Sequence, residues 1–369
     1  MTHSEDLIKQ VVARFFPDGE VIHIEQCNGG HINQTYFVDC RITPLDVNRY
    51  VVQCLNRKVF PDLPGLMDNV LRVSEQMSVY AQEHNMNMTR SYLHFMRTVD
   101  GAPSVDDKEL GFWRVYRYIN NAVGKLVAES PLEAFKTAEA FGLFQGMLAG
   151  LTGPRLVETI PAFHDTRKRF ERLERAASED KLGRFEGAKD VYEAIMAIKP
   201  YALALQEAFE NGEIPERVVH NDAKLSNILL DINTGNAICV IDLDTCMPGL
   251  AGHDFGDMAR SMSSQTPEDE EDLSKIKINF EIYESLIKGF LKGANGVLNT
   301  REVELLPDGG IAMTTEVAVR FLTDYLEGDV YFNIKYEGHN LRRSKSQLRL
   351  AQCMIEALPR LRKLVNSAK

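Results

Sequence analysis

The sequence lacks any apolar run long enough to cross a membrane, and basic residues are in the minority. Lys and Arg total 42 against 53 Asp and Glu, which gives a net charge of -11 over 369 residues. Nucleic acids and anionic membranes bind basic surfaces, so neither is an expected partner. The first twenty residues carry charges throughout, which argues against a secretory signal. We therefore expect a cytoplasmic protein that holds any anionic ligand locally.

Cysteine is scarce and scattered. The six cysteines form no C-x-x-C pair and no dense framework, which favours reduced thiols over a disulfide scaffold. Internal repeats and low-complexity segments are absent as well, and 44% of the residues are hydrophobic. That fraction supplies a buried core, and a chain of this length usually divides its core between two lobes or domains.

The first third of the chain has the pattern of a sheet followed by a helix. Three segments alternate apolar and polar residues, are rich in β-branched and aromatic types, and are separated by turn residues: Val21–Cys27, Gln34–Cys40 and Tyr50–Asn56. They predict a small antiparallel sheet. Over residues 65–84, apolar side chains recur at spacings of three and four, which predicts an amphipathic helix packed on that sheet.

The pattern changes after the extended, aromatic segment Gly111–Gly124. Ser130, Pro131 and Glu133 combine an N-cap, a first-turn proline and a capping-box acid, and so predict the start of a helix. From there the chain is mainly helical, apart from a non-helical block at about 216–250. Further helices are expected near 164–177, 188–210, 277–293, 311–327 and 344–366.

This change places a lobe boundary near residue 112. The predicted fold class is α+β, with a small antiparallel-sheet N-lobe at 1–112, a linker at 113–124 and a larger, mainly helical C-lobe at 125–369. The acidic run Thr266–Leu273 is expected to be a solvated loop or helix start, because isolated charge runs usually face water.

The residues with chemical potential lie inside the non-helical block. In "VVHNDAKLSNILL", polar residues separate two apolar runs at the spacing His220-x-Asp222-x-x-x-x-Asn227. A short turn and the strand-like "ICVIDLD" follow, so a hairpin would bring Asp222, Asn227 and Asp242 to one end. Phosphoryl transfer requires such a set: one carboxylate for the proton of an attacking hydroxyl, and an amide oxygen with a second carboxylate for Mg²⁺. The alternative is that these side chains only cap turns.

Together, "HNDAKLSNILL" and "VIDLD" resemble the catalytic loop and metal-binding strand of the aminoglycoside phosphotransferase and choline kinase superfamily, relatives of the protein kinases. The resemblance covers most of the chain and implies a bilobal protein-kinase-like fold, with ATP as co-substrate and Mg²⁺ as cofactor. It implies that Asp222 is the catalytic base and that Asn227 and Asp242 bind Mg²⁺. His220 would brace the loop. Lys224 either approaches the γ-phosphate or is a solvent-facing loop residue.

The same resemblance implies supporting roles elsewhere. Asp244 would fix the loop by hydrogen bonds or, alternatively, support the metal site from behind the metal ligands, and Asp254 and Asp257 in "GHDFGDMAR" would cap and brace a helix start. In "CNGGHINQTYFV", Gly29 and Gly30 occupy the turn that approaches the nucleotide phosphates, although Gly-Gly is also a common hairpin turn.

The third strand, "YVVQCLN", departs from the superfamily pattern. Gln53 stands where a Lys or Arg usually grips the α- and β-phosphates, and glutamine supplies hydrogen bonds but no charge. ATP would then be held through Mg²⁺ and other residues. The departure leaves open a nucleotide-binding pseudokinase, although a pure binder has no chemical need for the intact set Asp222, Asn227 and Asp242.

Three further segments resemble the bacterial N-acetylhexosamine 1-kinases, in which this glutamine is usual: Gln53–Val70, Val240–Leu250 and Arg320–Leu350. The reaction that this resemblance implies is ATP-dependent phosphorylation of the anomeric hydroxyl of GlcNAc or GalNAc. Its partners would then be ATP and a small sugar.

The resemblance also implies an acceptor site. Arg320 and Tyr331 fall on positions that contact the sugar, and Asp222 would touch its reacting hydroxyl. The alternative is that Arg320 and Asp324 form a surface pair and that Tyr331 packs. Homoserine, choline and aminoglycosides remain alternative acceptors. The basic segment "HNLRRSK" at 339–345 argues against choline, which favours an aromatic cage, and against aminoglycosides, which favour an acidic pocket.

Overall fold

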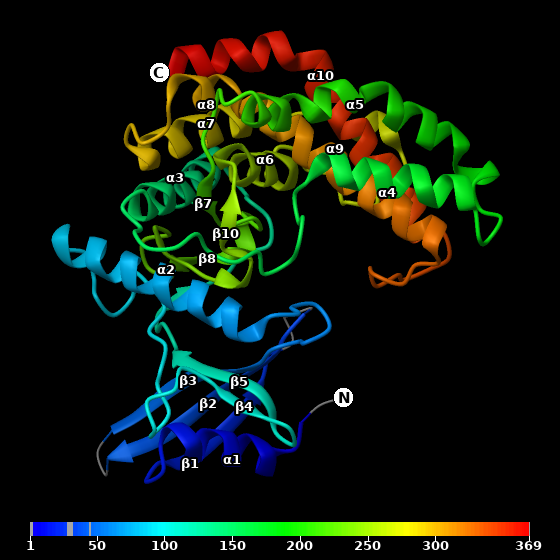
Figure 1. Cartoon of the computed structure of the whole chain (residues 1–369). Helices are drawn as coiled ribbons and strands as arrows, with labels where there is room; N and C mark the ends of the chain where they lie inside the picture. The colour runs from blue at the N-terminus through cyan, green and yellow to red at the C-terminus, as the bar shows by residue number, and fades with distance from the viewer. Residues whose placement is uncertain (1–2, 28–31, 44–45, 369) are drawn as a thin grey trace.

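The computed structural model describes residues 3–27, 32–43 and 46–368. In its N-terminal part, five antiparallel strands form one sheet in the order β1-β2-β3-β5-β4 (Figure 1). The three strands expected from the alternation are confirmed, with small shifts at their ends. The five strands are β1 (Glu20–Gln26), β2 (Gln34–Thr43), β3 (Asp46–Cys54), β4 (Val105–Asp107) and β5 (Gly111–Arg117).

The outer face of the sheet is covered by α1 (Glu5–Phe15), a helix that the sequence pattern did not predict. Val12 and Phe15 on its apolar face pack in one core with Tyr36 and Trp113 of the sheet. The spacing of these side chains along α1 is that of an amphipathic helix, so the signal was present in a short segment.

The helix expected to pack on the sheet is α2 (Leu63–Glu83), and it lies between the sheet and the helical part of the chain (Figure 1). Its buried side chains join a core that contains Phe141 and Phe144 of the C-terminal part, together with Leu55 and Phe112 near the sheet. α2 thus packs on the sheet, as expected, and in addition contacts the helical part of the chain. Periodicity identifies an apolar stripe but not the surface that the stripe meets.

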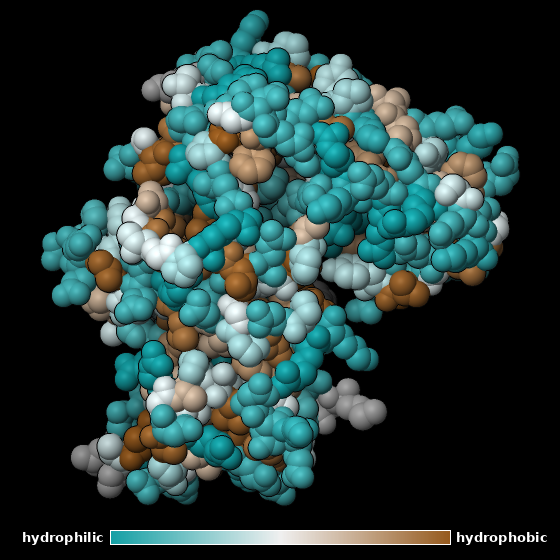
Figure 2. Space-filling model, in the orientation of Figure 1, coloured by the Kyte–Doolittle hydropathy of each residue, from teal (hydrophilic) through white to brown (hydrophobic). Residues whose placement is uncertain are grey.

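The rest of the chain is largely helical, as predicted, and within the described ranges no helix is both long and apolar enough to cross a bilayer. Hydrophilic residues cover most of the visible face (Figure 2). All six cysteines are free thiols. The helices are α3 (Pro131–Leu148), α4 (Thr166–Glu179), α5 (Lys189–Glu210), α6 (Ala251–Met262), α7 (Phe280–Ala294), α8 (Thr300–Glu304), α9 (Leu306–Glu327) and α10 (His339–Ala368).

The start of α3 has the predicted cap. Ser130 Oγ accepts a hydrogen bond from the N–H of Glu133 at 3.2 Å, and Pro131 occupies the first turn, where its missing N–H costs nothing. The capping residues therefore set the point at which the chain turns from the sheet-forming part into the helical part.

Between α5 and α6 the chain forms short strands and turns, as predicted for 216–250. β7 (Arg217–Val219) pairs with β10 (Met247–Gly249), and β8 (Ile228–Asp231) lies between β9 (Ala237–Val240) and β6 (Ala122–Val123). β6 and most of β5 fall within the segment 113–124, for which we predict a linker. The boundary between lobes at residue 112 stays a prediction.

Two helix crossings in the C-terminal part depend on glycine. α3 and α7 approach so closely that a Cβ on Gly293 would lie 2.0 Å from the carbonyl oxygen of Glu139. α6 and α9 meet in the same way, because a Cβ on Gly256 would lie 2.2 Å from the carbonyl oxygen of Gly309. Side chains at these points would overlap backbone atoms, so only glycine permits the observed spacing.

The acidic run Thr266–Leu273 does not simply face water. Glu271 pairs with Arg342 at 3.2 Å and Glu268 with Arg343 at 3.6 Å, both at the start of α10. The run is a loop whose residues are exposed or partly exposed, as expected. Its contacts with the basic segment 339–345 were not expected, and they offset the charges of Arg342 and Arg343, so this segment is weak evidence about the charge of an acceptor.

We expect Gly293→Ala to lower the free energy of unfolding by about 1–3 kcal/mol, because the added methyl group would force α3 and α7 apart. Gly146→Ala is the matched control: it lies in the same crossing, but its Cβ would be 3.6 Å from the carbonyl oxygen of Gly293, an ordinary contact. Urea unfolding followed by circular dichroism measures both variants. Equal stability of the two would contradict the close crossing.

Candidate active site

The polar motif of the non-helical block lies between β7 and the β8–β9 hairpin. The hairpin pairs so that the N–H of Ile241 donates to the carbonyl oxygen of Asn227 at 2.9 Å. This register places Asn227 and Asp242 at the same end of the hairpin. The loop before β8 carries Asp222, whose carboxylate contacts the Asn227 side chain. The structure thus brings together the three residues that the spacing had grouped.

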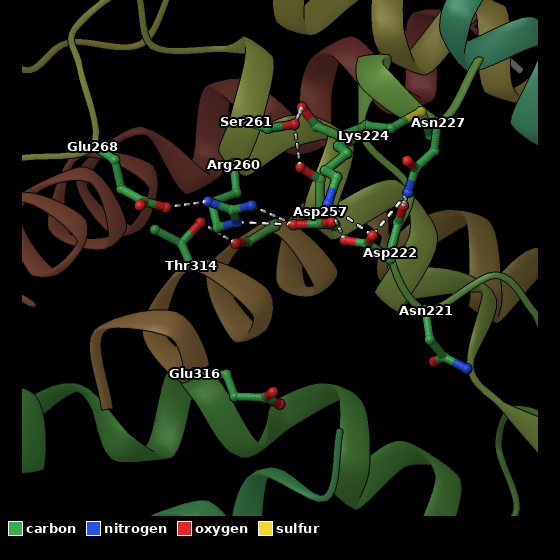
Figure 3. A network of polar contacts seen from close by, with 12 residues as sticks. Asn221, Asp222, Lys224, Asn227, Asp257, Arg260, Ser261, Glu268, Thr314 and Glu316 are labelled. Atoms are coloured by element: carbon green, nitrogen blue, oxygen red, sulfur yellow. Dashed lines mark hydrogen bonds and ion pairs between the residues drawn. The ribbon is translucent and has the colours of Figure 1, made fainter. Parts of the chain in front are cut away.

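Asp222 is held by two neighbours of its own loop (Figure 3). Lys224 Nζ and Asn227 Nδ2 each lie 2.8 Å from Asp222 Oδ2. Burial would raise the pKa of the Asp222 carboxyl, but Lys224 outweighs it and holds this pKa below its ordinary value. The carboxylate is therefore ionised at neutral pH and fixed in direction. Because Asn227 uses its amide hydrogens on Asp222, its side-chain oxygen stays available as an acceptor or metal ligand.

The backbone of the loop is fixed from behind by α6. The Asp254 carboxylate accepts the N–H of His220 at 2.9 Å and the N–H of Asn221 at 2.8 Å, and Gln145 Nε2 donates to it at 2.9 Å. His220 Nε2 lies 2.9 Å from the carbonyl oxygen of Ile241, so this histidine joins the loop to the end of β9. The contacts of His220 are those of a structural brace.

Lys224 faces a second carboxylate on α6 (Figure 3). Arg260 pairs with Asp257 at 2.7 Å and with Glu268 at 3.3 Å, which holds Asp257 in place. Burial would lower the pKa of Lys224, but the charges of Asp222 and Asp257 raise it above its ordinary value. Lys224 is therefore a charged member of the cluster and not a free loop residue. Asp257 braces this cluster through Arg260.

Asp242 begins the turn after β9 with a φ of 60°. This left-handed backbone is strained for a residue other than glycine. Asp242 as a whole residue is exposed to solvent. Partial desolvation of its carboxyl group, followed by the charges of Asp244 and Asp222, raises its pKa to about 6. A strained turn that holds a carboxylate close to others of like charge is typical of a functional site that binds a cation.

The residues at this end of the hairpin fit a Mg²⁺ ion. In the described part of the chain, no three His, Cys, Asp or Glu side chains lie close enough to hold a metal unaided. Mg²⁺ at phosphoryl-transfer sites does not need such a group, because water and phosphate oxygens complete its shell around one or two carboxylates. The Asp242 carboxylate and the Asn227 side-chain oxygen are donors of that kind.

Asp244 connects this turn to the N-terminal sheet. Arg114 Nη1 of β5 lies 2.5 Å from Asp244 Oδ1, and Asn33 Nδ2 donates to Asp244 Oδ2 at 2.6 Å. Arg114 Nε and Nη2 also donate to Gln53 Oε1, at 3.0 and 2.7 Å. Arg114 was not among the predicted site residues, although a basic residue inside the aromatic strand "GFWRVYR" was the available signal. Gly29 and Gly30 lie outside the described residues.

A second buried ion pair lies beneath the loop. His164 Nδ1 is 2.8 Å from Glu316 Oε1, and His164 Nε2 is 2.9 Å from the carbonyl oxygen of Asn221. Both partners are acceptors, so both ring nitrogens carry hydrogen and the imidazole is cationic. The pair ties α9 to Asn221, which has a φ of 62° and directly precedes Asp222. No sequence pattern linked His164 to Glu316, which are 152 positions apart.

The pKa values of this pair are shifted in opposite directions. Burial would lower the pKa of His164, but the Glu316 carboxylate raises it above the ordinary value. Burial would likewise raise the pKa of Glu316, but the His164 charge holds it at about 2. Each charge therefore stabilises the other in a site from which solvent is nearly excluded, with side-chain exposures of 5% and 1%.

The predicted acceptor residues come together beside α9. Arg320 Nη2 lies 3.5 Å from Tyr331 Oη, and the guanidinium lies 5.3–5.7 Å from the centres of the Phe163, Tyr331 and Phe332 rings. Arg169 and Tyr331 line a small cavity of about 40 Å³ with Arg320. The described residues give Arg320 no ion pair with a carboxylate, so its charge is available to a ligand.

The alternative pair between Arg320 and Asp324 is not formed. Asp324 is only 3% exposed, and its carboxylate accepts the backbone N–H groups of Val330, Tyr331 and Phe332 at 3.0, 2.8 and 2.9 Å. Asp324 thus fixes the loop that presents Tyr331, whose side chain remains 54% exposed.

Comparison with known proteins places this geometry in a family. A sequence model of the phosphotransferase enzyme family matches residues 23–284. The chain belongs to this family. The match includes the loop, the hairpin and the sheet that carries Gln53 and Arg114, but ends before the acceptor residues of α9.

Solved structures show the same fold. An aminoglycoside phosphotransferase from Alicyclobacillus acidocaldarius has a TM-score of 0.61 at 14% identity, over 97% of this chain and 96% of its own. Choline kinase from Cryptosporidium parvum has a TM-score of 0.57 at 13% identity, over 99% of both chains. An ADP-bound aminoglycoside phosphotransferase has a TM-score of 0.51 at 13% identity, over 95% of this chain and 99% of its own.

These likenesses confirm the predicted α+β, kinase-like fold. At such low identity they show the fold alone, and proteins named for different acceptors share it, so the fold does not select the acceptor. Family membership makes the chain a phosphotransferase. One of the proteins that share its fold, an aminoglycoside phosphotransferase, is bound to ADP.

We expect His164→Gln to lower the free energy of unfolding of this phosphotransferase by about 3 kcal/mol at pH 6, because it leaves the buried Glu316 without its cation. The raised pKa of His164 means that its contribution is complete below the ordinary value of 6.5 and is lost as pH rises through the folded value. Wild-type stability should therefore fall more steeply with rising pH than that of the variant. Urea unfolding between pH 5 and 9 measures this difference.

His94→Gln is the control, because the His94 ring contacts a single carbonyl oxygen, that of Met88, at 2.7 Å. This variant should keep the pH slope of the wild type. Parallel stability curves for wild type and His164→Gln would contradict a cationic His164.

Proposed function

We propose that this phosphotransferase transfers the γ-phosphoryl group of ATP, with Mg²⁺, to the anomeric hydroxyl of an N-acetylhexosamine, GlcNAc or GalNAc, and so forms the sugar 1-phosphate. The observation that carries the proposal is the Asp222 carboxylate, which Lys224 and Asn227 hold beside the hairpin end that bears Asp242. The choice of sugar rests on the resemblance of three segments to the N-acetylhexosamine 1-kinases and on the charges around Arg320.

The nucleotide has room along the inner face of the sheet. A cavity of about 600 Å³ lies where β3 meets the segment after β5, and Arg49 and Tyr118 are among its lining residues. Gln53 follows Arg49 on the same face of β3, roughly 13 Å away at the rise of a strand. Through Arg114, Gln53 is connected to Asp244. Asp244 lies in the turn after β9 that begins with Asp242, which we call the metal turn. Adenosine in the cavity would direct its phosphates along β3 toward Gln53.

Asp222 would act on the attacking hydroxyl. It accepts a hydrogen bond from the anomeric O–H, directs the oxygen at the γ-phosphorus, and receives the proton as the new O–P bond forms and the bond to ADP breaks. The lowered pKa makes Asp222 a weak base. That suits a loose transition state, in which the hydroxyl keeps its proton until late.

The other residues would offset charge. Lys224 lies beside Asp222 and would approach the negative charge of the transferred group. Asn227 and Asp242 would hold Mg²⁺, which supplies positive charge to the phosphate oxygens when bound. Gln53 would donate to a phosphate or orient Arg114, and Gly29 and Gly30 would approach the phosphates from the adjoining turn.

The acceptor cavity disfavours a cationic molecule. Burial lowers the pKa of Arg169, and the positive charge of the nearby Arg320 lowers this pKa further. Choline and aminoglycosides carry positive charge and would be repelled there. A neutral sugar, lying against this cavity of about 40 Å³ and not inside it, would suit these residues better, because a guanidinium donates to several hydroxyl and amide oxygens and the exposed Tyr331 ring offers a face for stacking.

The same two arginines favour one second candidate, a homoserine-type kinase. An α-carboxylate would pair with Arg320, which has no carboxylate partner among the described residues. Such a kinase would also require the hydroxyl of the acceptor to lie beside Asp222.

Turnover of an acceptor panel distinguishes these candidates. With ATP and Mg²⁺ we expect transfer to GlcNAc and GalNAc, with the anomeric phosphate identified by NMR, and not to glucose, homoserine, choline or kanamycin. Arg320→Met should raise the sugar KM about tenfold or more, because a charged hydrogen-bond donor is lost. Arg172→Met is the control, since Arg172 lines the same cavity but is paired with Glu327 at 2.5 Å. Transfer to homoserine alone would overturn the sugar assignment.

Asp222→Asn should lower kcat about 10²- to 10⁴-fold while the fold and ATP binding persist, because the amide cannot accept the proton. Asp231→Asn provides a matched change at the other end of β8, where the carboxylate pairs with Arg90. Steady-state kinetics, circular dichroism and calorimetric ATP binding test both variants. Full turnover by Asp222→Asn would exclude Asp222 as the base.

A further inference from the structure

The charge that β3 lacks at position 53 is supplied by the neighbouring strand. Gln53 and Arg114 are directly opposed in the β3–β5 register. Gln53 Nε2 donates to Thr35 Oγ1 at 3.0 Å, which turns the amide oxygen toward Arg114, and that oxygen accepts two guanidinium N–H groups. Gln53 is therefore an orienting acceptor, and the cation it orients is Arg114.

The oriented guanidinium extends from the sheet to the metal turn. Its Nη1 atom lies 2.5 Å from Oδ1 of Asp244, and both side chains are 3% exposed. Asn33 of β1–β2 reaches the other oxygen of Asp244 at 2.6 Å. Two residues of the N-terminal sheet region thus hold one carboxylate of the C-terminal part, two positions after Asp242.

Stability alone is a poor reason for this arrangement. Removing two charges from water costs about as much free energy as their attraction returns, so an apolar pair would serve the fold equally well. Geometry gives a better reason: the fork of Nε and Nη2 on Gln53 fixes the direction of the guanidinium, and the carboxylate that Nη1 then faces belongs to the strained turn of Asp242.

We propose that Arg114 is a positioning residue for the metal turn, which takes the place of a basic residue at position 53 and couples the approach of the sheet to the placement of Asp242. Gln53 orients Arg114, Arg114 fixes Asp244, and Asp244 fixes the backbone from which Asp242 projects. This role rests on the proposed function of Asp242 as a Mg²⁺ ligand.

The test compares Arg114→Met with Arg217→Met. Arg217, whose side chain is 19% exposed, forms an ion pair with the buried Glu302 at 2.5 Å and does not contact Asp244, so its variant controls for the loss of an ion pair in the fold. Calorimetry with ADP, in the presence and absence of Mg²⁺, and the Mg²⁺ dependence of turnover are measured for each. We expect Arg114→Met to weaken the Mg²⁺ contribution to ADP binding about 10- to 100-fold and Arg217→Met to leave it unchanged.

Two further variants test the route through Asp244. Asp244→Asn combined with Arg114→Met should be no worse than Arg114→Met alone, because both changes interrupt one connection. Arg114→Lys should recover part of the Mg²⁺ effect, since a lysine keeps the charge near Asp244 but loses the fork. Small-angle scattering without nucleotide should show a larger radius of gyration for Arg114→Met than for wild type.

If Arg114→Met does not fold, Gln53→Met replaces it, because that variant keeps the charge and removes only its orienting acceptor. A wild-type Mg²⁺ contribution to ADP binding in either folded variant overturns the proposal, as does additivity of the Arg114 and Asp244 changes. Failure to phosphorylate an N-acetylhexosamine would not change the effect of these variants on the Mg²⁺ contribution to ADP binding. Loss of the metal role itself would appear separately, as an unchanged Mg²⁺ effect in Asp242→Asn.

Discussion

One buried carboxylate, Asp254, holds the backbone on which the whole site depends. It accepts successive N–H groups from His220 and Asn221, while His164 holds the carbonyl oxygen of Asn221 from the other side. Asn221 is left-handed, a conformation that costs roughly 1–3 kcal/mol away from glycine and persists only where neighbours enforce it. Because both polar groups of this residue are held, Asp222 is directed toward the metal turn with little freedom to relax.

In the proposed mechanism the acidic chain would meet its ligands through a few placed cations. Lys224 would serve the catalytic loop, Arg114 the metal turn and Arg320 the acceptor, and the first two are each paired with an aspartate. The paired charges of Lys224 and Arg114 are balanced in the free protein, whereas Arg320, which has no carboxylate partner among the described residues, can pair with a ligand. Under the proposed function, this division would let a protein with a net charge of -11 receive a polyphosphate without a basic surface.

Local contacts were predictable from the sequence and distant ones were not. Asp222, Asn227 and Asp242 were grouped correctly because a short hairpin fixes their distance from one another. Arg114 was missed, because its contact with Asp244 depends on how the sheet meets the helical part and not on any local pattern. The contacts of the acidic run 266–273 with α10 were missed for the same reason, since its partners come from a remote segment.

The loop after α9 combines a fixed backbone path with side chains that are free to vary, two requirements that usually conflict. Asp324 binds the N–H groups of residues 330–332, which every amino acid except proline possesses, so the path of this loop depends little on its side chains. Side chains at these positions can therefore change while the backbone that carries them stays in place. A family with one catalytic loop could in this way acquire new acceptors by exchanging a few exposed residues, without disturbing the machinery for phosphoryl transfer.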